Sequence, residues 1–199
     1  MFPLIRRAAV AALAVTLAIP GAAWAQSGAG AYLAGQQAIS QADYAAAVGY
    51  YARVLALNPN NAEMMERLTL SQLALGQLKR AVPIAQRMEA AGLRSQVAHM
   101  VVTANLFATE KHAEILGRDL ETIGIGPLAD GLLTGWAHMG AGSVSQALTQ
   151  FDQVADQSGL RGFALYHKAL ALASVGDYEG AEALFAADGG ALTTISRRA

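Results

Sequence analysis

Residues 43–61, DYAAAVGYYARVLALNPNN, contain one complete helix together with the signals that begin and end it. Asp43 suits the N-cap position, because its carboxylate can accept hydrogen bonds from the free amides of the first turn. The pair Asn58-Pro59 ends the helix, since the residue before a proline is disfavoured in the helical region. Small and apolar residues stand at Ala47 and at steps of four, seven and eight after it. These steps place one apolar stripe on one helical face.

The same pattern returns along the chain at a regular period. Five small residues are separated by 34, 32, 34 and 34 positions: Ala47, Ala81, Ala113, Ala147 and Ala181. Four positions after them stand Tyr51, Ala85, Gly117, Phe151 and Phe185. Seven positions after them stand Val54, Met88, Leu120, Val154 and Asp188. A small residue followed by an aromatic one four positions later, at this period, indicates an array of helix-turn-helix repeats.

This pattern resembles that of the tetratricopeptide repeat (TPR) family. The resemblance covers about residues 28–190 and rests on the five alanines, on Tyr51, Phe151 and Phe185, and on the turn glycines Gly76, Gly142 and Gly176. It implies an all-α fold, a right-handed superhelical solenoid of about five repeats. The repeats are expected at about 28–61, 62–93, 94–127, 128–161 and 162–190.

The third repeat departs from the pattern. It is shorter than the others by two positions, and its second helix is expected over residues 111–123, with Ala113 and Gly117 in the repeated positions. Because the deletion can lie at either turn, the sequence does not determine which face of the first helix of this repeat points inward.

Residues 1–25 are typical of a secretory signal peptide. An Arg-Arg pair at 6–7 precedes an apolar run over 8–19, and Ala23-Trp24-Ala25 forms an A-x-A cleavage site before Gln26. The alternative is a transmembrane anchor, but a helix of this run spans about 18 Å, short of the roughly 30 Å of a bilayer core. We expect cleavage after Ala25 and a periplasmic or secreted protein, without membrane insertion once the signal is removed.

Composition limits the classes of partner. Removing the two signal arginines from 14 basic residues leaves 12 against 15 acids, a net charge of −3. This near-neutral balance argues against nucleic acid or an anionic membrane surface as the main partner. No cysteine occurs, so the fold relies on its core and not on disulfides.

The TPR resemblance implies a concave groove, lined by the first helix of each repeat, that holds a peptide or a helical segment of a partner. Carried over position by position, the groove takes Tyr32, Gln36, Glu63, Glu66, Leu70, Leu73, Leu132, Trp136, Met139, Phe163, Tyr166, His167 and Leu170. Trp136 and Tyr166 are the best anchors, because aromatic residues dominate binding energy at interfaces. The alternative is that some of these side chains pack between repeats, Trp136 among them.

The ligand class follows from what this groove does not offer. Chaperone-binding TPR proteins hold a carboxylate with a set of Lys, Asn and Arg, whereas Tyr32, Gln36 and Arg67 stand where that set would be. An apolar or helical ligand therefore fits better than a terminal carboxylate.

Catalytic and metal-binding patterns are missing from the sequence. The histidines His99, His112, His138 and His167 show no metal-ligand spacing, and the acids are scattered instead of paired. Ser143 follows Gly-Ala-Gly but lacks the lysine of a phosphate loop, so a turn and helix start explain it. We expect no catalytic site, no metal site and no cofactor.

These observations lead to one expected function and one alternative. The expected function is a non-catalytic protein–protein interaction scaffold of the bacterial periplasm, serving envelope assembly or secretion, with a protein or peptide partner that the sequence does not identify. The alternative is the repeat arm of a longer enzyme or envelope machine whose active domain lies beyond residue 199. Residues 191–199 resemble the start of a further first helix, so the chain is expected to be the N-terminal part of a longer array, or a premature stop.

Overall fold

The computed structural model describes residues 28–187, except the side chains of residues 121 and 122, and these residues form helices joined by turns. The helices are α1 (Gly28–Ser40), α2 (Tyr44–Leu57), α3 (Ala62–Ala74), α4 (Leu78–Ala90), α5 (Gln96–Ala108), α6 (His112–Leu116), α7 (Leu120–Ile123), α8 (Pro127–Gly140), α9 (Val144–Ala155), α10 (Arg161–Ser174) and α11 (Tyr178–Ala187). No strand occurs in this range, which confirms the all-α prediction. The predicted signal peptide over 1–25 and the segment 191–199 lie outside the described residues.

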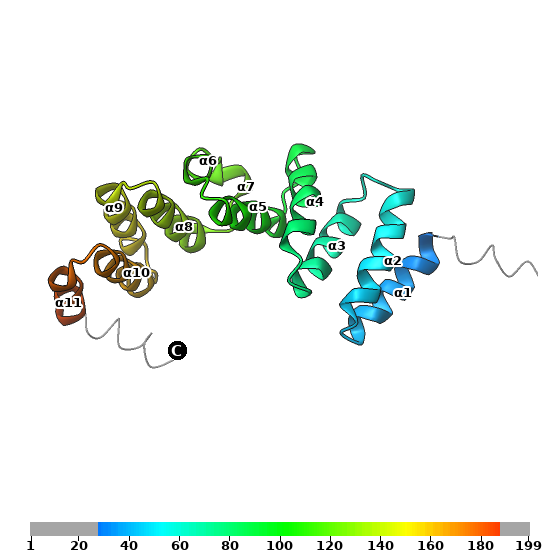
Figure 1. Ribbon diagram of the computed structural model, residues 1–199, viewed down its shortest axis with the longest axis horizontal. Coiled ribbons are helices and arrows are strands. Elements are labelled where there is room, and N and C mark those ends of the chain that lie inside the picture. Colours follow the sequence, from blue (N-terminus) through cyan, green and yellow to red (C-terminus); the bar gives the residue numbers. More distant parts are fainter. Residues whose placement is uncertain (1–27, 188–199) are drawn as a thin grey trace, which may run out of the picture.

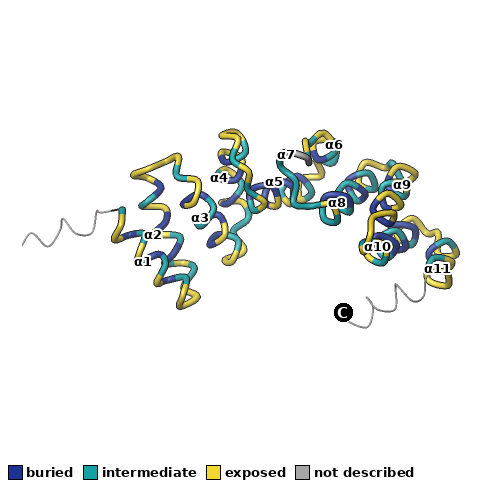
Figure 2. The backbone as a smooth tube through the Cα atoms, turned by 180° about the vertical axis from the view of Figure 1, so that it is seen from behind, coloured by how far each residue is buried: buried dark blue, intermediate teal, exposed yellow. Residues whose placement is uncertain are grey.

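The helices pack in chain order as an open arch (Figure 1). Helices α8 and α10 lie on the inner side of the curve, and α9 and α11 lie outside them. Most buried residues lie on helix faces that meet neighbouring helices, and the turns are largely exposed (Figure 2). No helix between residues 28 and 187 combines the length and the apolar character that a membrane crossing requires. The arrangement is the solenoid that the repeat period predicts.

Side-chain caps begin several helices as their sequences require. Asp43 accepts a hydrogen bond from the amide of Ala46 at 3.0 Å, as predicted for the start of α2. Asn61 accepts from the amide of Met64 at the start of α3, and Ser95 accepts from the amide of Ala98 at the start of α5. Each cap residue stands just before the first helical residue. These caps fix where each new helix starts after a turn.

The turn inside every repeat uses one residue in the left-handed conformation. These residues have φ between 56° and 87° and recur at the repeat spacing: Ala42, Gly76, Glu110, Gly142 and Gly176. In each case the next residue donates its amide to a carbonyl five positions earlier, as Lys111 does to Leu106 at 2.8 Å. Glycine adopts this conformation without strain, whereas alanine and glutamate do so at a cost.

Close approach between neighbouring helices depends on glycines that face buried aromatic rings. Tyr51 and Phe151 are fully buried, and their rings lie against Gly35 of α1 and Gly135 of α8. A Cβ atom at either glycine would overlap the ring. The small residue therefore makes the space that the aromatic ring of the following helix fills.

The third repeat corrects two expectations. Ala113 is exposed, and Ile115 is the buried residue, with 5% of its surface accessible. The expected single helix over 111–123 is two short helices, α6 and α7, because the chain leaves the helical course after α6 at its C-cap, Gly117. Ile115 stands one full repeat period after Ala81, so the period holds up to α6 and the deletion follows it.

The apolar core has two main parts. One cluster runs from α1 to α6 and reaches Ala137 of α8, and further clusters lie among α8, α9, α10 and α11. Where the first part meets α8, buried polar side chains stand at positions that other repeats fill with apolar ones. Asp130 takes the repeat position of Met64 and Ala164, and His99 takes that of Met65 and Leu165, all of which are buried.

Candidate partner-binding groove

The C-terminal half of the predicted groove is built on α8 and α10. Trp136 of α8 is half-buried, and its indole Nε1 donates to Nδ1 of His167 on α10 at 3.0 Å. The indole also meets the ring of Phe151 edge-on, with centroids 6.0 Å apart. Trp136, His167 and Phe151 therefore form an aromatic cluster that joins α8, α9 and α10, which favours the alternative that Trp136 packs between repeats.

His167 is held in one protonation state by this cluster. Because an indole N–H can only donate, Nδ1 of His167 accepts, and the proton of the neutral ring is on Nε2. Burial lowers the pKa of the His167 imidazole, which favours the same neutral form. The ring also stacks on Phe151 and meets Tyr166 edge-on, so its geometry is fixed from two sides.

Other side chains of the same half stay open to solvent. Phe163 and Leu170 of α10 are 45% and 40% exposed. The remaining predicted groove residues of this half, Leu132, Met139 and Tyr166, are half-buried. The exposed apolar surface of this half therefore comes mainly from α10, and Trp136 of α8 contributes less to it.

The N-terminal half of the predicted groove is a polar network between α1 and α3. Gln36 donates to the Tyr32 hydroxyl at 2.7 Å, and that hydroxyl donates to Glu63 at 3.3 Å. Arg67 donates to Glu63 at 2.8 Å and to the side-chain oxygen of Gln36 at 3.2 Å. The four polar groups satisfy one another, so they bind the two repeats together and leave little unpaired charge.

Three further predicted residues lie on α3, and one of them, Leu73, is half-buried against the apolar core. Glu66 accepts a hydrogen bond from Ser95 at the start of α5, at 3.0 Å, and so links the second and third repeats. Leu70 is 47% exposed and borders a pocket of about 170 Å³ together with Ile39, Tyr44, Tyr51, Arg67 and Ser71. Leu70 is the exposed apolar residue of this half of the groove.

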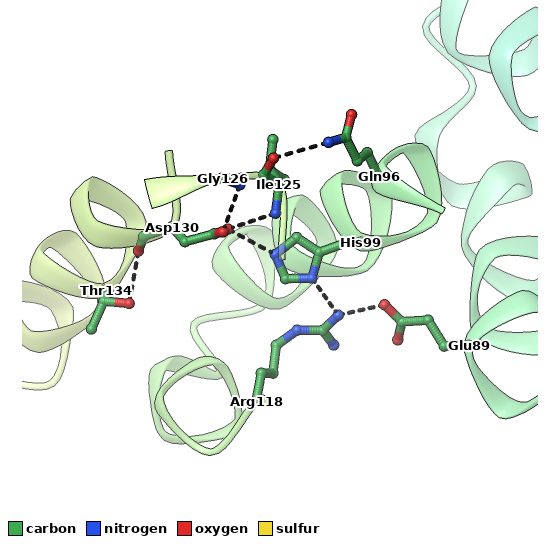
Figure 3. Close-up of polar contacts among 8 residues, drawn as sticks. All are labelled: Glu89, Gln96, His99, Arg118, Ile125, Gly126, Asp130 and Thr134. Atoms are coloured by element: carbon green, nitrogen blue, oxygen red, sulfur yellow. Dashed lines mark hydrogen bonds and ion pairs between the residues drawn. The ribbon is translucent and has the colours of Figure 1, made fainter. Parts of the chain in front are cut away.

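One groove residue was missed by sequence reasoning. Met100 of α5 is 42% exposed and stands one repeat period after Glu66, in the same repeat position. The distance from Glu66 to Met100 equals the repeat period. The sequence, however, did not decide whether the two-residue deletion lies before or after Met100, so its repeat position was not assigned. A second group was also missed: Glu89, His99, Arg118 and Asp130 meet inside the array, although they are scattered along the chain (Figure 3).

The described residues offer no geometry for a metal site. Between residues 28 and 187 no three His, Asp or Glu side chains converge in a way that could hold a metal ion. The polar groups of the groove bind one another or join neighbouring helices, and none forms a nucleophile–base pair in the contacts above. What this surface offers is apolar contact area on a rigid helical support.

Comparison with solved structures identifies the fold. The structure resembles two crystal structures of MamA, each at 19% identity, with TM-scores of 0.66 and 0.65. The alignments cover 81% and 82% of this chain and 89% and 95% of those chains. A thermophilic TPR protein of Thermus thermophilus, TTC0263, aligns over 84% of this chain and 92% of its own at 20% identity, with a TM-score of 0.48.

No protein-family model matches the sequence, and a search of curated proteins finds no match. The structural likeness at this level of identity shows the fold alone. Paired helices at a regular period, left-handed turn residues at the same spacing and the likeness to MamA agree with one another. The chain has the fold of a tetratricopeptide repeat solenoid.

Proposed function

We propose that this protein is a non-catalytic scaffold that binds a protein or peptide partner along the inner helices α3, α5, α8 and α10. The observation that carries the proposal is the exposure of four large apolar side chains on these helices. Leu70, Met100, Phe163 and Leu170 are between 40% and 47% exposed. Leu70 and Leu170 occupy the same repeat position in the second and fifth repeats. Contiguous apolar patches on a protein surface mark contact sites, and these four side chains are proposed to form one.

The chemistry of the groove favours an apolar ligand. Its charged and polar groups on α1 and α3 are already paired. A charged ligand would have to break the hydrogen bonds that join Tyr32, Gln36, Glu63 and Arg67. Leu70 beside its pocket, and Phe163 and Leu170 at the other end, offer apolar contact without that cost. An amphipathic helix or an extended apolar peptide would bury these side chains.

The cellular setting of the proposal is the bacterial periplasm, in envelope assembly or secretion. It rests on the charged start, apolar run and cleavage site over residues 1–25. The test is expression with the native N-terminus followed by mass spectrometry of the periplasmic fraction. The expected species begins at Gln26; an intact Met1 in the cytoplasmic fraction would contradict export.

The groove assignment is tested with paired variants. Leu70→Ser together with Leu170→Ser should abolish capture of the partner from periplasmic extract, because both ends of the apolar surface are lost. The matched control is Leu33→Ser with Leu57→Ser, since these leucines are 66% and 64% exposed but lie outside the predicted groove. Both proteins should keep full helicity by circular dichroism. Equal capture by the two variants would contradict the groove.

A further inference from the structure

Four buried or nearly buried charged and titratable groups meet at the centre of the array (Figure 3). They are Glu89 of α4, His99 of α5, Arg118 between α6 and α7, and Asp130 of α8; we call them the central polar cluster. The side chain of His99 is 1% exposed, those of Arg118 and Asp130 10% and 11%, and that of Glu89 17%. The cluster lies where the apolar core of the first helices meets α8, so it joins the two halves of the solenoid.

The contacts define the protonation state of His99. Arg118 Nη2 lies 2.9 Å from His99 Nδ1. A guanidinium can only donate, so Nδ1 is the acceptor and carries no proton. The proton of the neutral ring is therefore on Nε2, which faces Asp130 Oδ1 at 3.4 Å. Neutral His99 thus bridges a cation on one side and a carboxylate on the other.

The partners of His99 are themselves fixed. Arg118 pairs with Glu89 through the same Nη2 atom. Asp130 accepts from the backbone amides of Ile125 at 3.0 Å and Gly126 at 2.7 Å, at the start of α8. The cluster therefore ties α5 to the segment before α8 and to the segment after α6.

The charges around His99 come from the neighbouring elements. Glu89 stands on α4, Arg118 follows α6 and Asp130 stands on α8, while Glu66 of α3 contacts the start of α5 through Ser95. Burial lowers the pKa of His99, and the Arg118 charge lowers it further, whereas Asp130 and Glu89 oppose this. The contacts drawn in Figure 3 are those of the neutral His99 ring.

Protonation of Nδ1 is incompatible with that arrangement. It would place an N–H donor and a positive charge against the guanidinium that now donates to the same nitrogen. Arg118 would have to leave His99, while Glu89 still holds it and Asp130 still attracts the imidazolium. The contact between α5 and the Arg118 segment is the one that breaks. Because α6, which precedes Arg118, packs on α8, the angle between the groove helices α5 and α8 depends on this contact.

We propose that the central polar cluster is a pH-sensitive joint: neutral His99 holds the two halves of the solenoid in one orientation, and its protonation releases Arg118 and lets the halves move. The groove between Met100 of α5 and Leu132 of α8 would change width with this motion. A partner that bridges both halves would then bind in a pH-dependent way.

The joint is tested by a distance measurement on the full chain. The sequence contains no cysteine, so Ala45→Cys on α2 and Ala183→Cys on α11 introduce two unique label sites at exposed positions. Double electron–electron resonance between spin labels at these sites reports the relative placement of the two halves. The distance distribution should shift or broaden between pH 7.5 and pH 5, with full helicity by circular dichroism.

Two variants assign the change to His99. His99→Gln keeps a donor and an acceptor but does not titrate, so its distribution at pH 5 should match that at pH 7.5. His167→Gln is the matched control, because that half-buried imidazole bonds to Trp136 within one half, and it should keep the response. If His99→Gln does not fold, Arg118→Gln replaces it: without the guanidinium there is no like charge for the imidazolium to displace, so its distribution at pH 5 should match that at pH 7.5.

Three results would overturn the joint. The first is a distribution that does not change with pH in the parent protein. The second is a change that persists in His99→Gln or in Arg118→Gln. The third is loss of helicity at the same midpoint as the distance change, since the protein would then be unfolding as a whole.

Discussion

Overpacking at a helix crossing tests the corrected phase of the repeats. Ala147 of α9 is fully buried and packs with Phe151 and Ala171, whereas Ala113 of α6 is exposed. Both alanines held the same repeat position in the sequence pattern. Replacement of each by leucine adds the same three carbon atoms, so the pair isolates the effect of the surroundings.

The expected magnitudes follow from burial. Ala147→Leu forces extra volume into a filled interface between α8, α9 and α10, which should cost about 1–3 kcal/mol of unfolding free energy. Ala113→Leu extends into solvent and should stay within about 0.5 kcal/mol of the parent. For a domain of this size, about 1 kcal/mol corresponds to a Tm change of roughly 2–4 °C. Ala147→Leu should therefore melt about 2–12 °C lower.

The assay is thermal unfolding followed by the far-ultraviolet circular dichroism of the helices, with urea unfolding as a second measure of stability. Ala147→Leu should lower both Tm and the urea midpoint, and Ala113→Leu should change neither. A loss of stability for Ala113→Leu equal to that for Ala147→Leu would show that Ala113 is at a helix crossing. The assignment of the deletion to the segment after α6 would then be wrong.

Three further predictions concern the third repeat and the histidines His99 and His167. Ile115→Ala should cost about 2–5 kcal/mol in urea unfolding, because it opens a cavity in the apolar cluster that runs from α1 to α6; a cost below about 1 kcal/mol would argue against its core position. Glu110→Gly should raise stability by about 0.5–1 kcal/mol, since glycine takes the positive φ of 57° without strain, and a lower Tm would refute this. Stability should fall as pH decreases through about 6.5, because the pKa values of His99 and His167 are lowered in the fold and the unfolded chain then binds more protons. Thermal melts between pH 7.5 and 5 check this, and the double variant His99→Gln, His167→Gln should show a flatter profile.

Sequence alone determined the fold class, because its signals are local and repeated. Turns, several helix starts and the small–aromatic pattern are written within about one repeat, and their recurrence makes the period visible. Asp43 illustrates this, since a cap depends only on the three residues that follow it.

The candidate groove was only partly readable from the sequence. Repeat position put Leu70 and Leu170 on first helices, where the structure shows them exposed. Repeat position did not show that the Trp136 indole bonds to His167, because the two residues are 31 positions apart and the contact depends on how α8 and α10 approach each other. Exposure of a groove side chain is a property of its neighbours as well as of its own helix.

Only the tertiary structure decided the phase of the third repeat and the partners of His99. Both Ala113 and Ile115 can face a core, and the choice is made by the packing of α6 on α5 and α8. His99 and Asp130 stand on different helices and form no sequence motif, yet the array places them 3.4 Å apart. The physical reason is the same in both cases: helix periodicity fixes which residues share a face, whereas the partner of that face is set by long-range packing.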